Sequence, residues 1–336
     1  MTQASDIERI LRDWGGRPSV AVIDLDQLRT NIGELRRMTG DGVRLMAVVK
    51  ADGYGHGSIP VAKAALRSGA DELAVATVEE GVRLRASGVR APILVLGPIG
   101  ERERRRAISH DLMLVVASTD LARKLSADVR ASGRKQPLDV HVKIDSGMHR
   151  YGVEPDGAVD VARVIDGANE LRLAGVMTHF ACADDPDPAS TREQARVFDV
   201  VVGAIRQAGI EVPTEHLANS AATMRFPEFH RDRVRVGIAL YGLQPDAGMP
   251  LPPPMRPIMT VHSRLARVVS LEAGDRVSYG GTWAAEAATR VGLVPIGYAD
   301  GYRRQGSNLA WMDVSGERAP VRGRICMDQT LVEVGP

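Results

Sequence analysis

The feature that most constrains the fold is a repeated alternation of short apolar runs with segments of helical periodicity, which extends over about the first 240 residues. The candidate strands are Leu45–Lys50, Glu72–Ala76, Pro92–Gly97, Leu112–Val116, Leu138–Asp145, Leu173–His179, Thr214–Asn219 and Arg235–Tyr241. Helical patterns such as Ser58–Arg67, Ser118–Ser132 and Thr191–Ala208 separate most of them. Continuous apolar strands are typical of parallel sheets that helices cover. Eight repeats favour an α/β fold of the (β/α)8 barrel type over an open doubly wound sheet.

A proline-rich stretch, Pro250–Pro257, ends this alternation. The chain beyond it reads as β structure, with candidate strands at Thr260–Val269, Arg290–Ile296, Ala319–Arg322 and Thr330–Val334. We therefore predict a barrel over residues 1–250 and a C-terminal mainly-β domain over residues 251–336. We expect residues 18–24 to pair with the β domain. Because the sequence stops directly after a predicted strand, we also expect this domain to be truncated, with unpaired strand edges.

The charge balance argues against a polyanionic partner. The chain has 43 lysines and arginines and 42 acidic residues, a net charge of +1, so we predict no nucleic acid and no membrane as partner. Two cysteines, Cys182 and Cys326, imply no disulfide framework. The N-terminus has no signal-peptide pattern and no apolar stretch is long enough to span a bilayer, so we expect a cytoplasmic protein.

A barrel collects its chemistry at the C-terminal ends of its strands. Lys50 is the most informative residue there, because it follows an apolar run and precedes three closely spaced glycines, the last of them Gly57. A lysine against an apolar wall loses hydration, which lowers its pKa and makes it a usable nucleophile. Taken alone, Lys50 would more often be an ordinary strand-end lysine, His179 a satisfied core histidine and Ser220 a helix N-cap.

The segment Ala47–Gly57 resembles the pyridoxal-phosphate lysine motif of the alanine racemase family. Further segments resemble that family in the same order along the chain: His141–Gly152, Met177–Ala181, His216–Ala222, Arg233–Gly242, Val277–Trp283, Gly297–Tyr302 and Gly323–Gln329. The resemblance runs from about Pro18 to the last residue. It implies a fold-type III enzyme that interconverts L- and D-alanine with pyridoxal 5'-phosphate and supplies D-alanine for peptidoglycan.

The resemblance also implies a role for each matching residue. Lys50 would hold the cofactor, and Lys50 and Tyr279 would be the two acid–base groups on opposite faces of the substrate. The other cofactor-binding residues would be Tyr54, His179, Asn219, Ser220, Arg235, Gly237 and Ile238. Arg150 and the backbone amide of Met327 would bind the substrate carboxylate. Lys143, which is carbamylated in several relatives, Tyr298 and Asp328 would support the site, and no metal is expected.

Arg235 bears on the type of reaction. An acidic partner would keep the ring nitrogen of the cofactor protonated and the ring a strong electron sink. An arginine accepts no proton, so the ring stays neutral and the less stabilised carbanion is reprotonated quickly. This favours racemisation over side reactions such as transamination.

In this family Tyr279 and Met327 would come from the partner subunit, so a homodimer with shared active sites is expected. Several alternatives stay open. The enzyme could racemise serine or a broader range of amino acids, or the chain could be an inactive cofactor-binding fragment or a non-catalytic cofactor-binding protein. A decarboxylase of the same class would use an acid opposite the ring nitrogen and a cysteine. Arg235 argues against it, although Cys326 keeps it open.

Overall fold

The structure, a computed structural model, describes residues 4–13 and 15–335 and separates into two units. One unit is Asp24–Ile258. The other combines the residues before Asp24 with those from Met259 onward. Each unit is described by itself below.

The first unit is built on an eight-stranded parallel sheet in the order β8-β7-β6-β5-β4-β3-β2-β9. Its strands are β2 (Arg44–Val48), β3 (Glu72–Val75), β4 (Ile93–Val95), β5 (Met113–Val116), β6 (Leu138–Lys143), β7 (Leu171–Met177), β8 (Glu215–His216) and β9 (Arg233–Val236). Near the two end strands, the Asp232 amide donates to the Glu215 carbonyl at 3.3 Å and the Arg235 amide to the Ala218 carbonyl at 3.0 Å. The sheet is therefore a nearly closed barrel, and the predicted fold class is confirmed.

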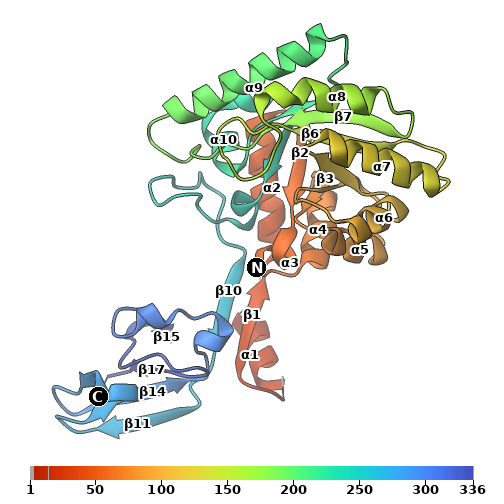
Figure 1. Cartoon of the computed structure of the whole chain (residues 1–336). Coiled ribbons are helices and arrows are strands. Elements are labelled where there is room, and N and C mark those ends of the chain that lie inside the picture. Colours follow the sequence, from red (N-terminus) through yellow and green to blue (C-terminus); the bar gives the residue numbers. More distant parts are fainter. Residues whose placement is uncertain (1–3, 14, 336) are drawn as a thin grey trace. The chain divides into compact units, whose positions relative to one another are not determined.

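Helices connect the strands, and Figure 1 shows α5 to α8 along the outside of the sheet. Their bounds are α2 (Leu25–Thr39), α3 (Lys50–Tyr54), α4 (Ser58–Arg67), α5 (Val78–Ala86), α6 (Glu101–Ser109), α7 (Thr119–Ala131), α8 (Ala158–Asp166), α9 (Ala189–Gln207) and α10 (Ser220–Arg225). Leu28, Ile32 and Leu35 of α2 are fully buried at helical spacing, so they form its inner face. Among the described residues, none of the helices has the length and apolarity needed to cross a membrane.

The barrel interior follows from the two-residue period of the strands. An apolar cluster there consists of Met46, Val48, Ala74, Leu94, Met113, Val115 and Met177. In the strand register Met46 lies beside Arg235, and Val115 lies beside His141. Neighbouring residues in register point to the same face, so these polar side chains also face the interior. Apolar side chains from β2 to β5 and from β7 therefore share the barrel interior with polar side chains from β6 and β9.

The second unit is mainly β, as predicted. After α1 (Ala4–Asp13), β1 (Ser19–Ile23) pairs with β10 (Met259–Ser263), and β14 (Thr289–Val294) lies between β11 (Arg267–Leu271) and β17 (Thr330–Glu333). Two short hairpins join β12 (Arg276–Val277) to β13 (Trp283–Ala284) and β15 (Trp311–Val314) to β16 (Glu317–Pro320). Val294, Ala319, Val321, Ile325 and Val332 form its core.

Most predicted strand bounds shift by one to three residues in the structure, as at β2, which ends at Val48 instead of Lys50, and some differences are larger. The predicted strand Thr260–Val269 is two strands, because the chain leaves its pairing with β1 and the Ala266 amide bonds to the Leu293 carbonyl of β14 instead. The predicted strand Arg235–Tyr241 begins at Arg233 and ends at Val236, and a 3₁₀ turn, η3 (Ile238–Tyr241), follows Gly237. Strands β12, β13 and β15 were not predicted. The first two have only two residues each, and the Trp311–Val314 segment of β15 is only partly buried.

Candidate functional site

Lys50 opens a strained turn directly after β2. Residues 51–54 have φ values between 52° and 63°, which is the left-handed region. Each non-glycine residue there costs about 1–2 kcal/mol, so the surrounding contacts must impose this conformation. A Cβ on Gly53 would lie 3.2 Å from the Cα of Ser58. The Asp52 carboxylate accepts from the amide and the hydroxyl of Ser58, both at 2.9 Å, and these bonds lower its pKa. The turn therefore fixes the backbone on which Lys50 sits.

The phenol of Tyr54 lies against the loop that follows β9. A Cβ on Gly237 would lie 2.4 Å from the Tyr54 hydroxyl oxygen, so no other residue fits at this position without displacing the phenol. The Tyr54 ring is 4.7 Å from the ring of Tyr241, whose hydroxyl donates to the Val48 carbonyl at 3.0 Å. Burial raises the pKa of Tyr54, so the phenol stays protonated and can donate.

Asn219 and Ser220 have separate tasks at the start of α10. Asn219 is the N-cap, and its side-chain oxygen accepts from the Ala222 amide at 3.0 Å. The buried hydroxyl of Ser220 instead accepts from the amides of Gly237 at 3.0 Å and Ala239 at 3.3 Å. The structure thus brings Tyr54, Ser220 and the turn that begins with Gly237 and Ile238 together.

Arg235 is buried and held by many acceptors. Its guanidinium donates to the carbonyls of Thr178 at 2.6 Å, His216 at 2.7 Å and Leu217 at 3.0 Å. It also lies 3.3 Å from Nδ1 of His179. Burial and the nearby Arg233 lower its pKa to about 9, which leaves it charged at neutral pH. This network fixes the orientation of the guanidinium inside the barrel.

Positive charge gathers at this C-terminal end of the barrel. Burial, followed by the charges of Arg235, Arg150 and Lys50, lowers the pKa of Lys143 to about 8. Burial, followed by the charges of Arg235, Lys143, Arg150 and Lys50, holds the pKa of His179 well below its ordinary value. Nζ of Lys143 lies 5.2 Å from the centre of the Tyr151 ring. The arrangement favours an anionic ligand.

Asp145, whose charge opposes the lowering of the Lys143 pKa, shapes the loop that carries Arg150. One of its oxygens accepts from the amides of Gly147, Met148 and His149, at 2.9 to 3.1 Å. These bonds lower the pKa of Asp145 although burial opposes them. Arg150 follows this loop and is exposed.

The second unit carries the remaining predicted residues. Tyr279, Met327 and Asp328 line a cavity of about 590 Å³ together with Ser278, Gly280, Cys326 and Gln329. The Tyr279 side chain is 68% exposed and the Met327 side chain 53%. Tyr298 opens the turn η5 (Tyr298–Asp300), and its amide donates to the Cys326 carbonyl at 3.0 Å. Within this unit the structure therefore groups all four predicted residues.

Sequence reasoning missed a pair of buried histidines behind Arg235. Nδ1 of His216 lies 3.1 Å from Nη1 of Arg235, and Nε2 of His216 lies 3.0 Å from Nδ1 of His141. One signal could have shown this. His141 precedes Lys143 by two residues on β6, so both side chains face the barrel interior.

Comparison with known proteins supports the family suggested by the motifs. Residues 23–245 match the alanine racemase N-terminal domain, and residues 258–336 match the alanine racemase C-terminal domain. An alanine racemase of Desulforamulus reducens is 44% identical over 324 residues, covering 95% of this chain and 86% of the relative. The chain therefore belongs to the alanine racemase family.

Solved structures agree with this assignment. Alanine racemase from D-cycloserine-producing Streptomyces lavendulae has a TM-score of 0.89 and 38% identity, covering 94% of this chain and 84% of that one. The Bacillus anthracis alanine racemase with bound L-Ala-P has a TM-score of 0.87 and 34% identity, covering 95% and 82%.

Proposed function

We propose that the protein is an alanine racemase that interconverts L- and D-alanine with pyridoxal 5'-phosphate as cofactor. The observation that carries this proposal is the buried Arg235, fixed by three carbonyls at the cation-rich end of the barrel. Membership of the family supports the same reaction. An arginine there donates hydrogen bonds and accepts no proton, which suits racemisation as argued from the sequence.

The residues of the barrel suit this cofactor. The phosphate would be held by the Tyr54 hydroxyl, which lies where a Cβ on Gly237 would be, by the Ser220 hydroxyl and by the Ile238 amide. Lys50 would bind the cofactor covalently, Arg235 would donate to the ring nitrogen, and His179 and Asn219 would support this arrangement. When bound, pyridoxal phosphate supplies an electron sink that acidifies the α-proton of the substrate.

Lys50 and Tyr279 would exchange the α-proton from opposite faces. In this proposal Lys50 acts on the D-enantiomer and Tyr279 on the L-enantiomer. Arg150 would bind the substrate carboxylate in a fork, assisted by the Met327 amide, while Tyr298 and Asp328 would border the substrate path. The α-carbon then remains fixed while the proton moves.

Lys143 would position Arg150 as a carbamate. A pKa of about 8 leaves more neutral amine at physiological pH than an ordinary lysine has. That amine would add to CO2 and release a proton, and the resulting anion would pair with the guanidinium of Arg150. The lowered pKa of Lys143 thus supports its expected role as a carbamate.

We further propose a homodimer in which Tyr279 and Met327 complete the active site of the other subunit. The exposure of both side chains supports this arrangement. Mixing a Tyr279→Phe protein with a Lys50→Ala protein under exchanging conditions should restore part of the activity, since one heterodimer site keeps both groups. No restoration would contradict the shared site. The D-alanine formed would supply peptidoglycan synthesis in the cytoplasm, so loss of the protein should create a D-alanine requirement.

The direct test is chiral analysis of the products after addition of pyridoxal phosphate and L-alanine, with L-serine in parallel. D-alanine formation is the expected result. D-serine formed at a comparable rate would extend the substrate class. No D-product from protein that binds the cofactor would overturn the proposal.

A further inference from the structure

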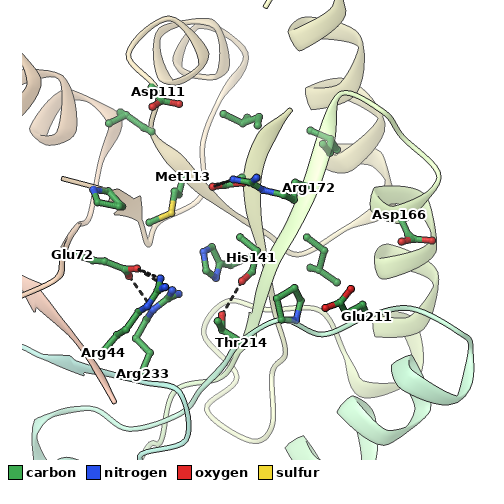
Figure 2. A pocket seen from close by; sticks show the side chains of 18 of the residues that line it. Arg44, Glu72, Asp111, Met113, His141, Asp166, Arg172, Glu211, Thr214 and Arg233 are labelled. Atoms are coloured by element: carbon green, nitrogen blue, oxygen red, sulfur yellow. Dashed lines mark hydrogen bonds and ion pairs between the residues drawn. The ribbon is translucent and has the colours of Figure 1, made fainter. Parts of the chain in front are cut away.

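A second cavity, of about 710 Å³, lies at the other end of the barrel (Figure 2). Its lining includes Arg44, Glu72 and Arg233, which are the first residues of β2, β3 and β9. Asp139 and Arg172, the second residues of β6 and β7, also line it. Because the strands are parallel, their first residues share the N-terminal end. The cavity is therefore separate from the end that carries Lys50.

Most charges around this cavity are paired by the chain itself. Nη1 of Arg44 lies 3.2 Å from Glu72, and Nε of Arg233 lies 2.9 Å from the same carboxylate. Arg172 and Asp139 form a separate ion pair. Two guanidinium groups thus share one carboxylate at the inner end of the cavity, which we define by Glu72, His141 and Arg233, and the exposed Asp232 adds a negative charge near Arg233.

Four buried polar atoms at this inner end make no hydrogen bond within residues 4–13 and 15–335. Nε of Arg233 and Oε2 of Glu72 face each other as an ion pair at 2.9 Å, and two nitrogen atoms have no partner of either kind. They are Nη1 of Arg233, whose residue is 3% exposed, and Nε2 of His141, whose residue is 0% exposed. Figure 2 labels Arg233 and His141 among the residues that line the cavity, and the charge of Arg233 contributes to the lowered pKa of His141. A buried polar atom without a partner costs about 1–3 kcal/mol, so both atoms favour a ligand.

Both unpartnered atoms are hydrogen-bond donors. Arg235 can only donate, so Nδ1 of His216 must accept and Nε2 of His216 must carry its proton. That proton is donated to Nδ1 of His141, and the proton of His141 is therefore on Nε2. Burial and the nearby arginines lower the pKa of His141 to about 3, so the ring is neutral and keeps this tautomer.

The backbone makes room for the histidine in this orientation. The register of β6 with β7 shifts between Val140 and His141, and His141 then lies opposite Gly175. A Cβ on Gly175 would lie 2.9 Å from Nδ1 of His141 and 2.3 Å from the Thr214 hydroxyl oxygen. Any larger residue at 175 would displace the ring, so the position of His141 in the cavity lining depends on this glycine.

We propose that the inner end of this cavity binds a small monoanion, a carboxylate or a halide, through the Nε2–H of His141 and the Nη1–H of Arg233. Two donors with no acceptor of their own, one of them on a charged guanidinium, favour an anion over a cation or a neutral ligand. This anion site is formed by the N-terminal end of the barrel and does not depend on the reaction proposed above.

Bromide is the probe that locates the site. Crystals of the holoenzyme, whose catalytic end is filled by the cofactor, are soaked in bromide and measured by anomalous diffraction. A peak within hydrogen-bond distance of both His141 Nε2 and Arg233 Nη1 is expected. Absence of this peak, while surface bromide peaks appear, would overturn the proposal.

Two variants test the donors separately. His141→Asn keeps an acceptor for His216 near the position of Nδ1 but removes the donor, and Arg233→Lys keeps a charge beside Glu72 but removes Nη1. Each should weaken binding at least about tenfold, the loss expected for one hydrogen bond to a charged group. A bromide peak of undiminished occupancy in both variants would overturn the assignment. If one variant does not fold, the other still tests the site.

Thermal unfolding of the holoenzyme in bromide and in acetate then identifies the anion. Ligands that bind only the folded state raise the melting temperature. A larger rise in acetate at equal concentration would assign a carboxylate, and a larger rise in bromide a halide. Either rise should be smaller in both variants, and equal rises in wild type and variants would contradict a site at these donors.

Discussion

The two ends of the barrel differ in how their charges are balanced. At the N-terminal end, Glu72 pairs with both Arg44 and Arg233. At the C-terminal end, Lys143 is surrounded by Lys50, Arg150 and Arg235, and the nearby Asp145 already accepts from three backbone amides. The chain largely neutralises its own charges at the first end, which supports folding. At the second end a ligand must supply the negative charge, which is typical of a functional site.

The largest effect is expected for Lys50→Arg at the C-terminal end. Arginine keeps the positive charge but offers no neutral amine near physiological pH, so it cannot bind the cofactor covalently or remove a proton. Racemase activity should fall by at least about 10³-fold, which corresponds to about 4 kcal/mol. D-alanine formation measures the loss. The exposed Lys124→Arg is the matched control, and comparable activity in both variants would contradict the role of Lys50.

Glu72→Gln tests the balance at the N-terminal end. The substitution keeps the size but leaves the buried Arg233 without its carboxylate, and breaking such a pair costs about 3 kcal/mol. Urea unfolding of the cofactor-free protein should show this loss. Glu193→Gln removes the partner of Arg196 in an exposed pair and should change the free energy of unfolding by less than about 0.5 kcal/mol. A Glu72 effect as small as the control would mean that this end is not balanced by its ion pairs.

Lys143→Met should raise the free energy of unfolding, whereas Glu72→Gln lowers it, because the methionine removes a cation from the end with excess positive charge. Its folded-state pKa of about 8 lies below the ordinary value of 10.5. Between these values the unfolded state binds more protons, so the stability of the cofactor-free protein rises with pH. Below about pH 8 the charged lysine destabilises the fold, and Lys143→Met should stabilise it there by about 1–3 kcal/mol.

Urea unfolding between about pH 7 and 10.5 measures this contribution. The rise in stability that Lys143 causes should disappear in Lys143→Met and remain in the exposed control Lys124→Met. Identical pH profiles for the two variants would show that Lys143 is not destabilised by its cationic neighbours.

Asn219→Ala should have the smallest effect. Asn219 caps α10 at the C-terminal end, and loss of an N-cap costs about 1 kcal/mol. Thermal unfolding of the cofactor-free protein should show the loss, and Asn219→Ser should restore most of it because serine also caps well. If alanine and serine behave alike, the cap does not contribute at this position.

Several features of the fold could be predicted because they depend on local pattern. Continuous apolar runs placed all eight barrel strands within about two residues at their starts, and the predicted helix Ser58–Arg67 coincides with α4. The end of β9 could not be read in this way. Val236 and Leu240 are equally apolar, and only the turn at Gly237, imposed by contacts with Tyr54 and Ser220, ends the strand.

In the candidate site too, some residues could be predicted from local sequence and others could not. Lys50 and Arg235 could be proposed from motifs, because their neighbours in sequence carry the signal. The chain of hydrogen bonds from Arg235 through His216 to His141 could not, because the three residues lie on three different strands. The left-handed turn after Lys50 also escaped prediction, since only three-dimensional contacts hold Ala51, Asp52 and Tyr54 at positive φ.

The sequence by itself determined the fold class, the order of the elements and the positions at which reactive side chains are attached, since these follow from apolar periodicity and from short motifs. Only the tertiary structure decided which charges meet. The parallel register places Arg233 of β9 beside Arg44 of β2, and Glu72 of β3 pairs with both, while the excess positive charge gathers at the opposite end. Pairing between charges depends on distances of a few ångströms, and such distances between residues far apart in the chain exist only after the barrel has closed.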